Sequence, residues 1–89
     1  MTRYDLAMTL HDVLVQGQIQ SALDVLEPAT GPRVQVEVEG GVVYLRGVVV
    51  SDWEQAKAER IAREVSPPTV SQIVNELIVN PFLPPLPHP

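Results

Sequence analysis

Apolar and polar residues alternate strictly from residue 34 to residue 39, where three valines are interleaved with three polar side chains. A period of two is typical of a β-strand that buries one face. The Gly40-Gly41 pair follows directly and predicts a two-residue hairpin turn, because both turn residues can take a positive φ. This turn fixes an antiparallel register with three facing pairs, which are Val38 and Val43, Val36 and Leu45, and Val34 and Gly47.

The second strand of this hairpin has one face for the core and a second face that is also apolar. The register turns four residues inward: Val43, Leu45, Gly47 and Val49. A glycine in mid-strand weakens pairing unless another segment approaches closely, and a packed helix is the simplest candidate for Gly47. The opposite face carries Val42, Tyr44, Arg46, Val48 and Val50. That set is more apolar than a solvated sheet face should be.

The N-terminal third carries two apolar stripes with helical spacing. The first comprises Leu6, Leu10, Val13 and Leu14. The second comprises Val15, Ile19, Ala22, Leu23 and Leu26. The two stripes differ in direction by more than a quarter turn, so one straight helix would bury both of them badly. Gly17 lies between them, and we expect the helix to break there and to resume from about Gln18 to Glu27.

A further helix begins at the sequence Ser-Asp-Trp-Glu. Ser51 and Glu54 have the spacing of a capping box, with Ser51 as the N-cap. The helix is expected to run to about Val65, and its narrow buried face comprises Ala58, Ile61, Ala62 and Val65. Ser66 and the two prolines after it end the helix.

A last strand is predicted from about Val70 to Val79, with apolar residues on both faces. Asn75 is expected to point inward and therefore to need a hydrogen-bond partner, most simply a nearby loop backbone. The ten residues from Asn80 to Pro89 include five prolines. This composition predicts a polyproline II tail outside the core.

These elements predict an α+β fold, with an αββαβ order and a three-stranded mixed sheet that carries two helices on one face. Residues 1–17 form an N-terminal helical extension, residues 18–79 the domain and residues 80–89 the proline-rich tail. The last strand follows a helical crossover from the second strand and should run parallel to it. We expect it to pair with the first strand, which would then be central.

The order of elements resembles the BON domain (bacterial OsmY and nodulation domain) family. Gly41 and Gly47 resemble the turn glycine and the strand glycine of that family, and the alanine-rich helix and the closing strand around Asn75 also match. Pro67 and Pro68 depart from the Gly-Val that usually precedes its last strand. The resemblance covers about residues 19–79. It implies a non-catalytic module associated with membrane or phospholipid attachment, envelope stress and protein association.

Charge and composition argue against several classes of function and of binding site. The 89 residues carry a net charge of −5, and their six basic residues are scattered. This argues against a nucleic-acid partner and against simple capture by an anionic membrane. The chain has no cysteine, which excludes disulfides and cysteine-based metal sites. No signal peptide is visible. A natural start at residue 1 would predict a cytoplasmic protein, and a trimmed chain leaves a periplasmic or envelope location open.

Trp53 is the single tryptophan, and a helical wheel places it near Lys57 and Arg60, away from the buried helix face. A tryptophan there could enter a membrane interface or a partner pocket. The alternative is that its ring folds over the helix start and stacks on Lys57.

No constellation of residues indicates catalysis, a metal site or a cofactor. His11 and His88 lie far apart in the sequence, and the serines occupy positions typical of caps and turns. Glu37 and Glu39 are expected to lie on a solvent-exposed face of their strand. The apolar face of the second strand has three possible uses. It could form a dimer interface, face lipid, or be covered by the N-terminal helix or the proline tail.

The sequence therefore predicts a non-catalytic binding module for a membrane surface or an envelope-associated protein. The alternative is a self-associating structural protein, and a homo-oligomer is expected. A cation-sensing domain that uses backbone carbonyls of the 67–70 loop is a third, weaker hypothesis.

Overall fold

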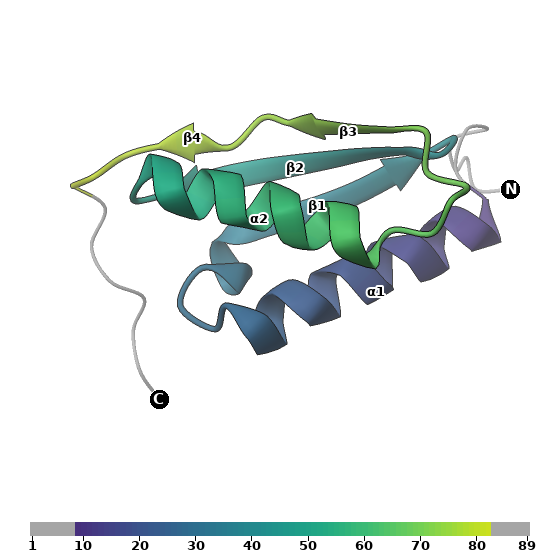
Figure 1. The fold of residues 1–89 in the computed structure, drawn as a ribbon, viewed down its shortest axis with the longest axis horizontal. Helices are drawn as coiled ribbons and strands as arrows, with labels where there is room; N and C mark the ends of the chain where they lie inside the picture. The colour runs from purple at the N-terminus through teal and green to yellow at the C-terminus, as the bar shows by residue number, and fades with distance from the viewer. Residues whose placement is uncertain (1–8, 83–89) are drawn as a thin grey trace, which may run out of the picture.

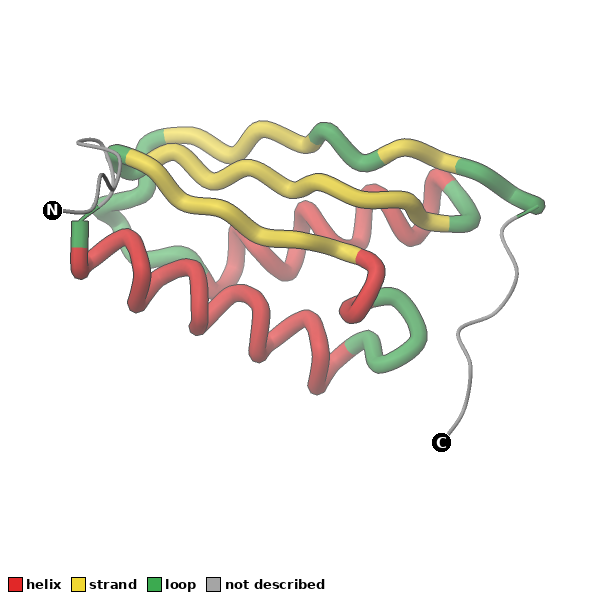
Figure 2. The backbone as a smooth tube through the Cα atoms, turned by 180° about the vertical axis from the view of Figure 1, so that it is seen from behind, coloured by secondary structure: helices red, strands yellow, loops and turns green. Residues whose placement is uncertain are grey.

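A mixed β-sheet lies in one layer and two helices lie side by side in the other (Figures 1 and 2). The computed structural model describes residues 9–82. The elements in chain order are α1 (Leu10–Leu26), the 3₁₀ turn η1 (Gly31–Arg33), β1 (Val34–Glu39), β2 (Val42–Val49), α2 (Asp52–Val65), β3 (Gln72–Asn75) and β4 (Ile78–Val79). The predicted α+β class is confirmed, as is the placement of both helices on one face. The sheet has four strands instead of three.

The hairpin of β1 and β2 forms in the predicted register. Val38 faces Val43, and the ladder continues to Val34 opposite Gly47. The turn residues Gly40 and Gly41 have φ values of 59° and 81°, in the region that glycine reaches without steric cost. The alternating valines of β1 therefore lie in the core, as a strand with one buried face requires.

The expected break at Gly17 is wrong. α1 is one continuous helix through that residue, because the fold buries only one of the two apolar stripes. Val15, Ile19 and Leu23 are fully buried, whereas Leu10 on the other stripe stays exposed. The stripes therefore do not compete, and no change of helix direction is needed.

The expected strand order is also wrong. β2 is the central strand, with β1 antiparallel on one side and β3 and β4 parallel on the other. The parallel direction relative to β2 is confirmed. The outer edge of β1 is unavailable for another strand, because side chains of α1 hydrogen-bond to it: Gln16 accepts from the Val38 N–H, and Gln20 accepts from the Val36 N–H.

The predicted last strand is split into β3 and β4. Between them the Asn75 Oδ1 accepts a hydrogen bond from the Leu77 N–H at 3.1 Å, and Gln55 Nε2 donates to the Leu77 carbonyl at 2.8 Å. These side chains replace ladder bonds at that point. Leu77 itself is buried in the core, so the interruption inserts an apolar side chain between the sheet and α2.

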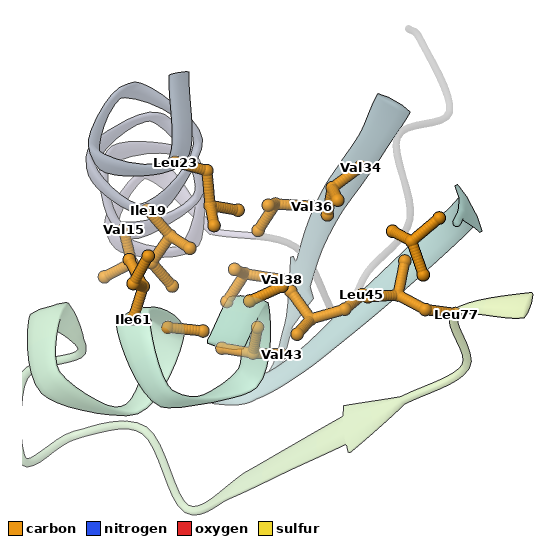
Figure 3. Packing of buried hydrophobic residues seen from close by; sticks show 13 residues of the cluster. Val15, Ile19, Leu23, Val34, Val36, Val38, Val43, Leu45, Ile61 and Leu77 are labelled. Atoms are coloured by element: carbon orange, nitrogen blue, oxygen red, sulfur yellow. The ribbon is translucent and has the colours of Figure 1, made fainter. Parts of the chain in front are cut away.

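The core fills the space between the sheet and the two helices (Figure 3). Its largest fully buried side chains come from α1, β1 and β2: Ile19, Leu23, Leu45, Val34, Val38, Val43 and Val49. The small residues Ala58 and Ala62 let α2 approach the sheet closely. The expected packing of a helix on Gly47 is wrong. Gly47 has φ 129°, and a Cβ there would lie 2.0 Å from the Arg33 carbonyl oxygen, so the backbone at the end of η1 occupies that space and neither α1 nor α2 does.

Candidate functional site

The sheet face opposite the helices is the larger of two candidate surfaces. It carries the five predicted residues of β2 and its end, Val42, Tyr44, Arg46, Val48 and Val50, and two from the parallel strands, Val74 and Ile78. We call these seven residues the outer sheet face. Both helices lie on the other side of the sheet (Figure 2). Among the three alternatives for this face, cover by the N-terminal helix is therefore wrong for the described part of that helix, and residues 83–89 of the tail lie outside the described residues.

Exposure and charge vary across the outer sheet face. Ile78 is 63 % exposed, whereas the valines and Tyr44 are half-buried by their neighbours. Arg46 is the cation at its centre, with the guanidinium 4.9 Å above the Tyr44 ring. Its Nε donates to Glu76 at 2.8 Å, and its Nη1 is paired with Glu37. The hydrogen bond to Glu76 raises the pKa of Arg46 above its usual value, and the charges of the nearby carboxylates raise it further.

The second surface lies on α2, on the helix side of the molecule. Trp53 is 64 % exposed there, and Lys57 Nζ lies 4.6 Å from the centre of its ring, so the predicted stacking is confirmed. Lys57 Nζ also pairs with Glu27 at the end of α1, at 2.7 Å. A shallow pocket of about 140 Å³ is lined by Trp53, Ala56, Lys57 and Arg60. We call these four residues the Trp53 pocket.

The fold does not bring the two surfaces together. The outer sheet face points away from both helices, whereas Trp53, Lys57 and Arg60 belong to α2 on the helix side of the sheet (Figure 1). A flat partner therefore cannot contact both surfaces at once. The two surfaces have to be tested as separate sites.

Asp12 is a buried carboxylate whose role the sequence analysis did not identify. It is only 3 % exposed. It completes a capping box with Thr9 and accepts hydrogen bonds from the N–H groups of Thr9, Gly40 and Gly41 at 3.0, 2.9 and 3.3 Å. These hydrogen bonds lower the pKa of Asp12, and the bond from the Thr9 N–H has the largest effect. The Thr-x-x-Asp spacing before an apolar run was the signal that could have identified the cap.

Gln16 and Gln20 continue the same row on α1, at successive i+4 positions after Asp12. Gln20 accepts from the Val36 N–H at 3.2 Å and donates to the Val34 carbonyl at 3.0 Å, and Gln16 accepts from the Val38 N–H at 3.1 Å. The helix thereby satisfies the outer edge of β1. An exposed edge strand is a template for pairing with another chain, and this edge is closed.

Ser51 and Asn75, which were predicted to be structural, perform the expected kinds of role, with one change of partner in the capping box. Ser51 caps α2 by accepting from the Glu54 N–H at 3.1 Å, but Glu54 accepts from Val50 instead of from Ser51. Asn75 donates to the Gln55 carbonyl and to Glu59, each at 3.1 Å. Its Oδ1 also accepts from the Leu77 N–H in the loop between β3 and β4, so the expected loop backbone is one of its partners and α2 supplies the others.

The chemistry within residues 9–82 is limited. No group of three or more His, Cys, Asp or Glu side chains in that range is arranged to hold a metal ion. In the 67–70 loop, which was suggested for cation sensing, the Pro67 carbonyl accepts a hydrogen bond from the Val70 N–H at 3.0 Å. This carbonyl is therefore already hydrogen-bonded within the loop. No helix of the described residues is long and apolar enough to cross a membrane.

Two comparisons with known proteins bear on this arrangement. The family model described as BON domain matches residues 11–81, which is most of the chain. The match begins at His11, close to the start of α1, so it takes in the first turns of the helix that the sequence analysis had assigned to an extension. The search of curated proteins found no significant match.

Proposed function

Since the chain belongs to the BON domain family, we propose that it is a non-catalytic binding module that associates with a second copy of itself through the outer sheet face. BON domains are generally non-enzymatic binding domains. The observation that carries the proposal is the apolar face of β2, β3 and β4, which the described helices leave uncovered because both pack on the other side (Figure 2). Contiguous apolar surface of this kind usually belongs to an interface.

The charges on and beside the outer sheet face favour a protein partner over an anionic bilayer. Arg46 is flanked by Glu37 and Glu76, and Glu39 lies on the same side of β1. Three carboxylates against one guanidinium repel anionic headgroups, and the net charge of −5 adds to that repulsion.

The charged groups of the outer sheet face can pair with those of a second copy of the chain. A two-fold interface brings identical patches together, so any charged group in it needs a partner of opposite sign on the same patch. Arg46 and the acidic residues around it meet that requirement, and the valines and Ile78 supply the apolar area. An envelope-associated protein would have to offer the same combination of apolar surface and charge.

The size of the patch predicts weak association. Two strand positions at about 4.8 Å, those of β2 and of its parallel neighbours, and eight residues at about 3.3 Å give a projected area of about 250 Å². A standard interface buries about 800 Å² per partner. The dimer should therefore depend on concentration and dissociate on dilution.

Light scattering from micromolar to millimolar concentration tests the proposal, and an average mass that rises towards that of a dimer supports it. Flotation with vesicles of phosphatidylglycerol and phosphatidylethanolamine tests the lipid alternative. A chain that stays monomeric throughout, or one that floats with these vesicles while monomeric, would overturn the proposal. Cation sensing is tested by the melting temperature across monovalent and divalent salts.

A further inference from the structure

We propose that the Trp53 pocket is a docking site for a proline-rich segment, and that its occupant is the chain's own tail, residues 83–89. The pocket combines an exposed indole ring, a small residue beside it and two cationic side chains with aliphatic stems. Extended proline-rich segments bind shallow grooves lined with aromatic side chains, because they bring little conformational entropy to lose. The site lies on the helix side, so this inference does not depend on the proposed dimer face.

The pocket is held in shape before any ligand arrives. Lys57 is fixed between two partners, since its Nζ lies 4.6 Å from the centre of the Trp53 ring and 2.7 Å from Glu27 Oε2. The lysine side chain is only 26 % exposed. The stack orients the indole ring and leaves it 64 % exposed to solvent. A large exposed aromatic ring with a fixed orientation is the usual anchor of a peptide-binding site.

The tail starts at the same end of the molecule as the pocket. The Asn80 N–H donates to the Val49 carbonyl at 2.7 Å, which places Asn80 beside the residue four positions before Trp53. The Asn80 Oδ1 then accepts from the Phe82 N–H at 3.0 Å. This turn ends the strand, and Phe82 follows it with 90 % of its surface exposed. β4 and the start of α2 lie next to each other in Figure 1.

The tail is long enough to cover the pocket. Seven residues in a polyproline II conformation span about 22 Å, at about 3.1 Å per residue. The pocket extends along α2 from Trp53 to Arg60, which is about 10 Å at about 1.5 Å per residue. A tail that starts beside Val49 can therefore lie along this stretch of the helix without unfolding β4.

The tail has the chemistry that such a pocket selects. It reads Leu-Pro-Pro-Leu-Pro-His-Pro, with Leu83 and Leu86 three positions apart. Three residues make one turn of a polyproline II helix, so both leucines lie on the same side of it. That side can pack on the Trp53 ring while the unpaired carbonyls, typical of proline-rich chains, face the cationic groups of Lys57 and Arg60. The contact would cover an aromatic side chain that otherwise stays in water.

Trp53 reports directly on this contact, because the chain has a single tryptophan. The experiment compares the emission spectrum and acrylamide quenching of the full chain with those of a double variant, Leu83→Ser with Leu86→Ser. The variant keeps the tail length and every proline. We expect its emission to shift to longer wavelength and its quenching to increase. Val25→Ser, which removes an exposed apolar side chain from α1, is the matched control and should change neither.

Two further measurements identify the occupant. A synthetic peptide of residues 80–89, added to the double variant, should return the emission towards shorter wavelength with saturation. The emission of the unmodified chain should not change on dilution, since the tail of the same copy is bound. Equal emission and quenching in the unmodified chain and the double variant would overturn the proposal. So would a shift produced by phosphatidylglycerol vesicles and not by the peptide, and a shift on dilution would overturn the assignment to the same copy.

Discussion

Asp12 in the first turn of α1 accepts a hydrogen bond from the Gly40 N–H in the hairpin turn, 28 residues further along the chain, at 2.9 Å. The same carboxylate closes the capping box with Thr9. One side chain therefore fixes both the start of the helix and its position on the edge of the sheet. The two glutamines after it in the row, Gln16 and Gln20, extend the attachment along β1.

Asp12→Asn should lower the melting temperature at neutral pH, because an amide is a weaker acceptor for three N–H groups than a carboxylate. The pKa of Asp12 is lowered in the folded state, chiefly by the Thr9 N–H and then by the Gly40 N–H. Its contribution to stability is therefore complete above the unfolded pKa of about 3.9 and is lost as the pH falls through the lower folded value.

Thermal unfolding followed by circular dichroism across the acidic range measures this effect. The Asp12→Asn variant should lose less stability on acidification than the unmodified protein does, since its amide does not titrate. Asp24→Asn, an exposed position on the same helix, serves as the control. If the Asp12→Asn variant lost as much stability on acidification as the unmodified protein does, the Asp12 carboxylate would not be a source of the pH dependence.

Gly47→Ala should destabilise the protein, whereas Gly17→Ala should stabilise it. At Gly47 the new Cβ would meet the Arg33 carbonyl oxygen at 2.0 Å, and φ 129° strains any L side chain, at a cost of about 1–3 kcal/mol or more. A Cβ at Gly17 meets no described atom within 4 Å, and alanine in a helix interior is favoured by about 0.8–1.0 kcal/mol. Urea unfolding measures whether each substitution raises or lowers the free energy of unfolding. Destabilisation by Gly17→Ala would contradict the continuous helix.

Gln20→Ala should open the edge of β1. The substitution removes the acceptor of the Val36 N–H and the donor to the Val34 carbonyl, and leaving such groups unpaired costs about 1–3 kcal/mol. Hydrogen exchange at the Val36 amide should accelerate, and aggregation on heating should increase because the edge can pair with another chain. Gln18→Ala changes an exposed residue on the same helix and should have neither effect.

The parts of the fold that depend on short-range rules were predictable from the sequence. The valines of β1 with the Gly40-Gly41 turn predicted the register, and Ser51 predicted the start of α2. The strand order was not predictable in this way, because it depends on Gln16 and Gln20 of α1 hydrogen-bonding to the edge of β1, which is a tertiary contact. The burial of one α1 stripe and not the other is likewise a tertiary outcome.

The candidate surfaces were predicted in part. The pattern predicted the residues of the outer sheet face, and the helical wheel predicted Trp53 beside Lys57. The partner of Lys57 on α1, Glu27, could not be inferred, because no local rule places the end of α1 next to α2. Asp12 was missed for a different reason, since its cap pattern was present in the sequence but its bonds to Gly40 and Gly41 require the folded hairpin.

Sedimentation equilibrium of the full chain tests the central claim most directly, when it is compared with Ile78→Lys on the outer sheet face and with Val25→Lys on α1. Both substitutions place a lysine at an exposed aliphatic position, so they match in chemistry and differ in location. We predict a reversible monomer–dimer equilibrium for the unmodified chain and for Val25→Lys, and a monomer for Ile78→Lys. Identical behaviour of all three proteins, or loss of the dimer in Val25→Lys alone, would contradict the account.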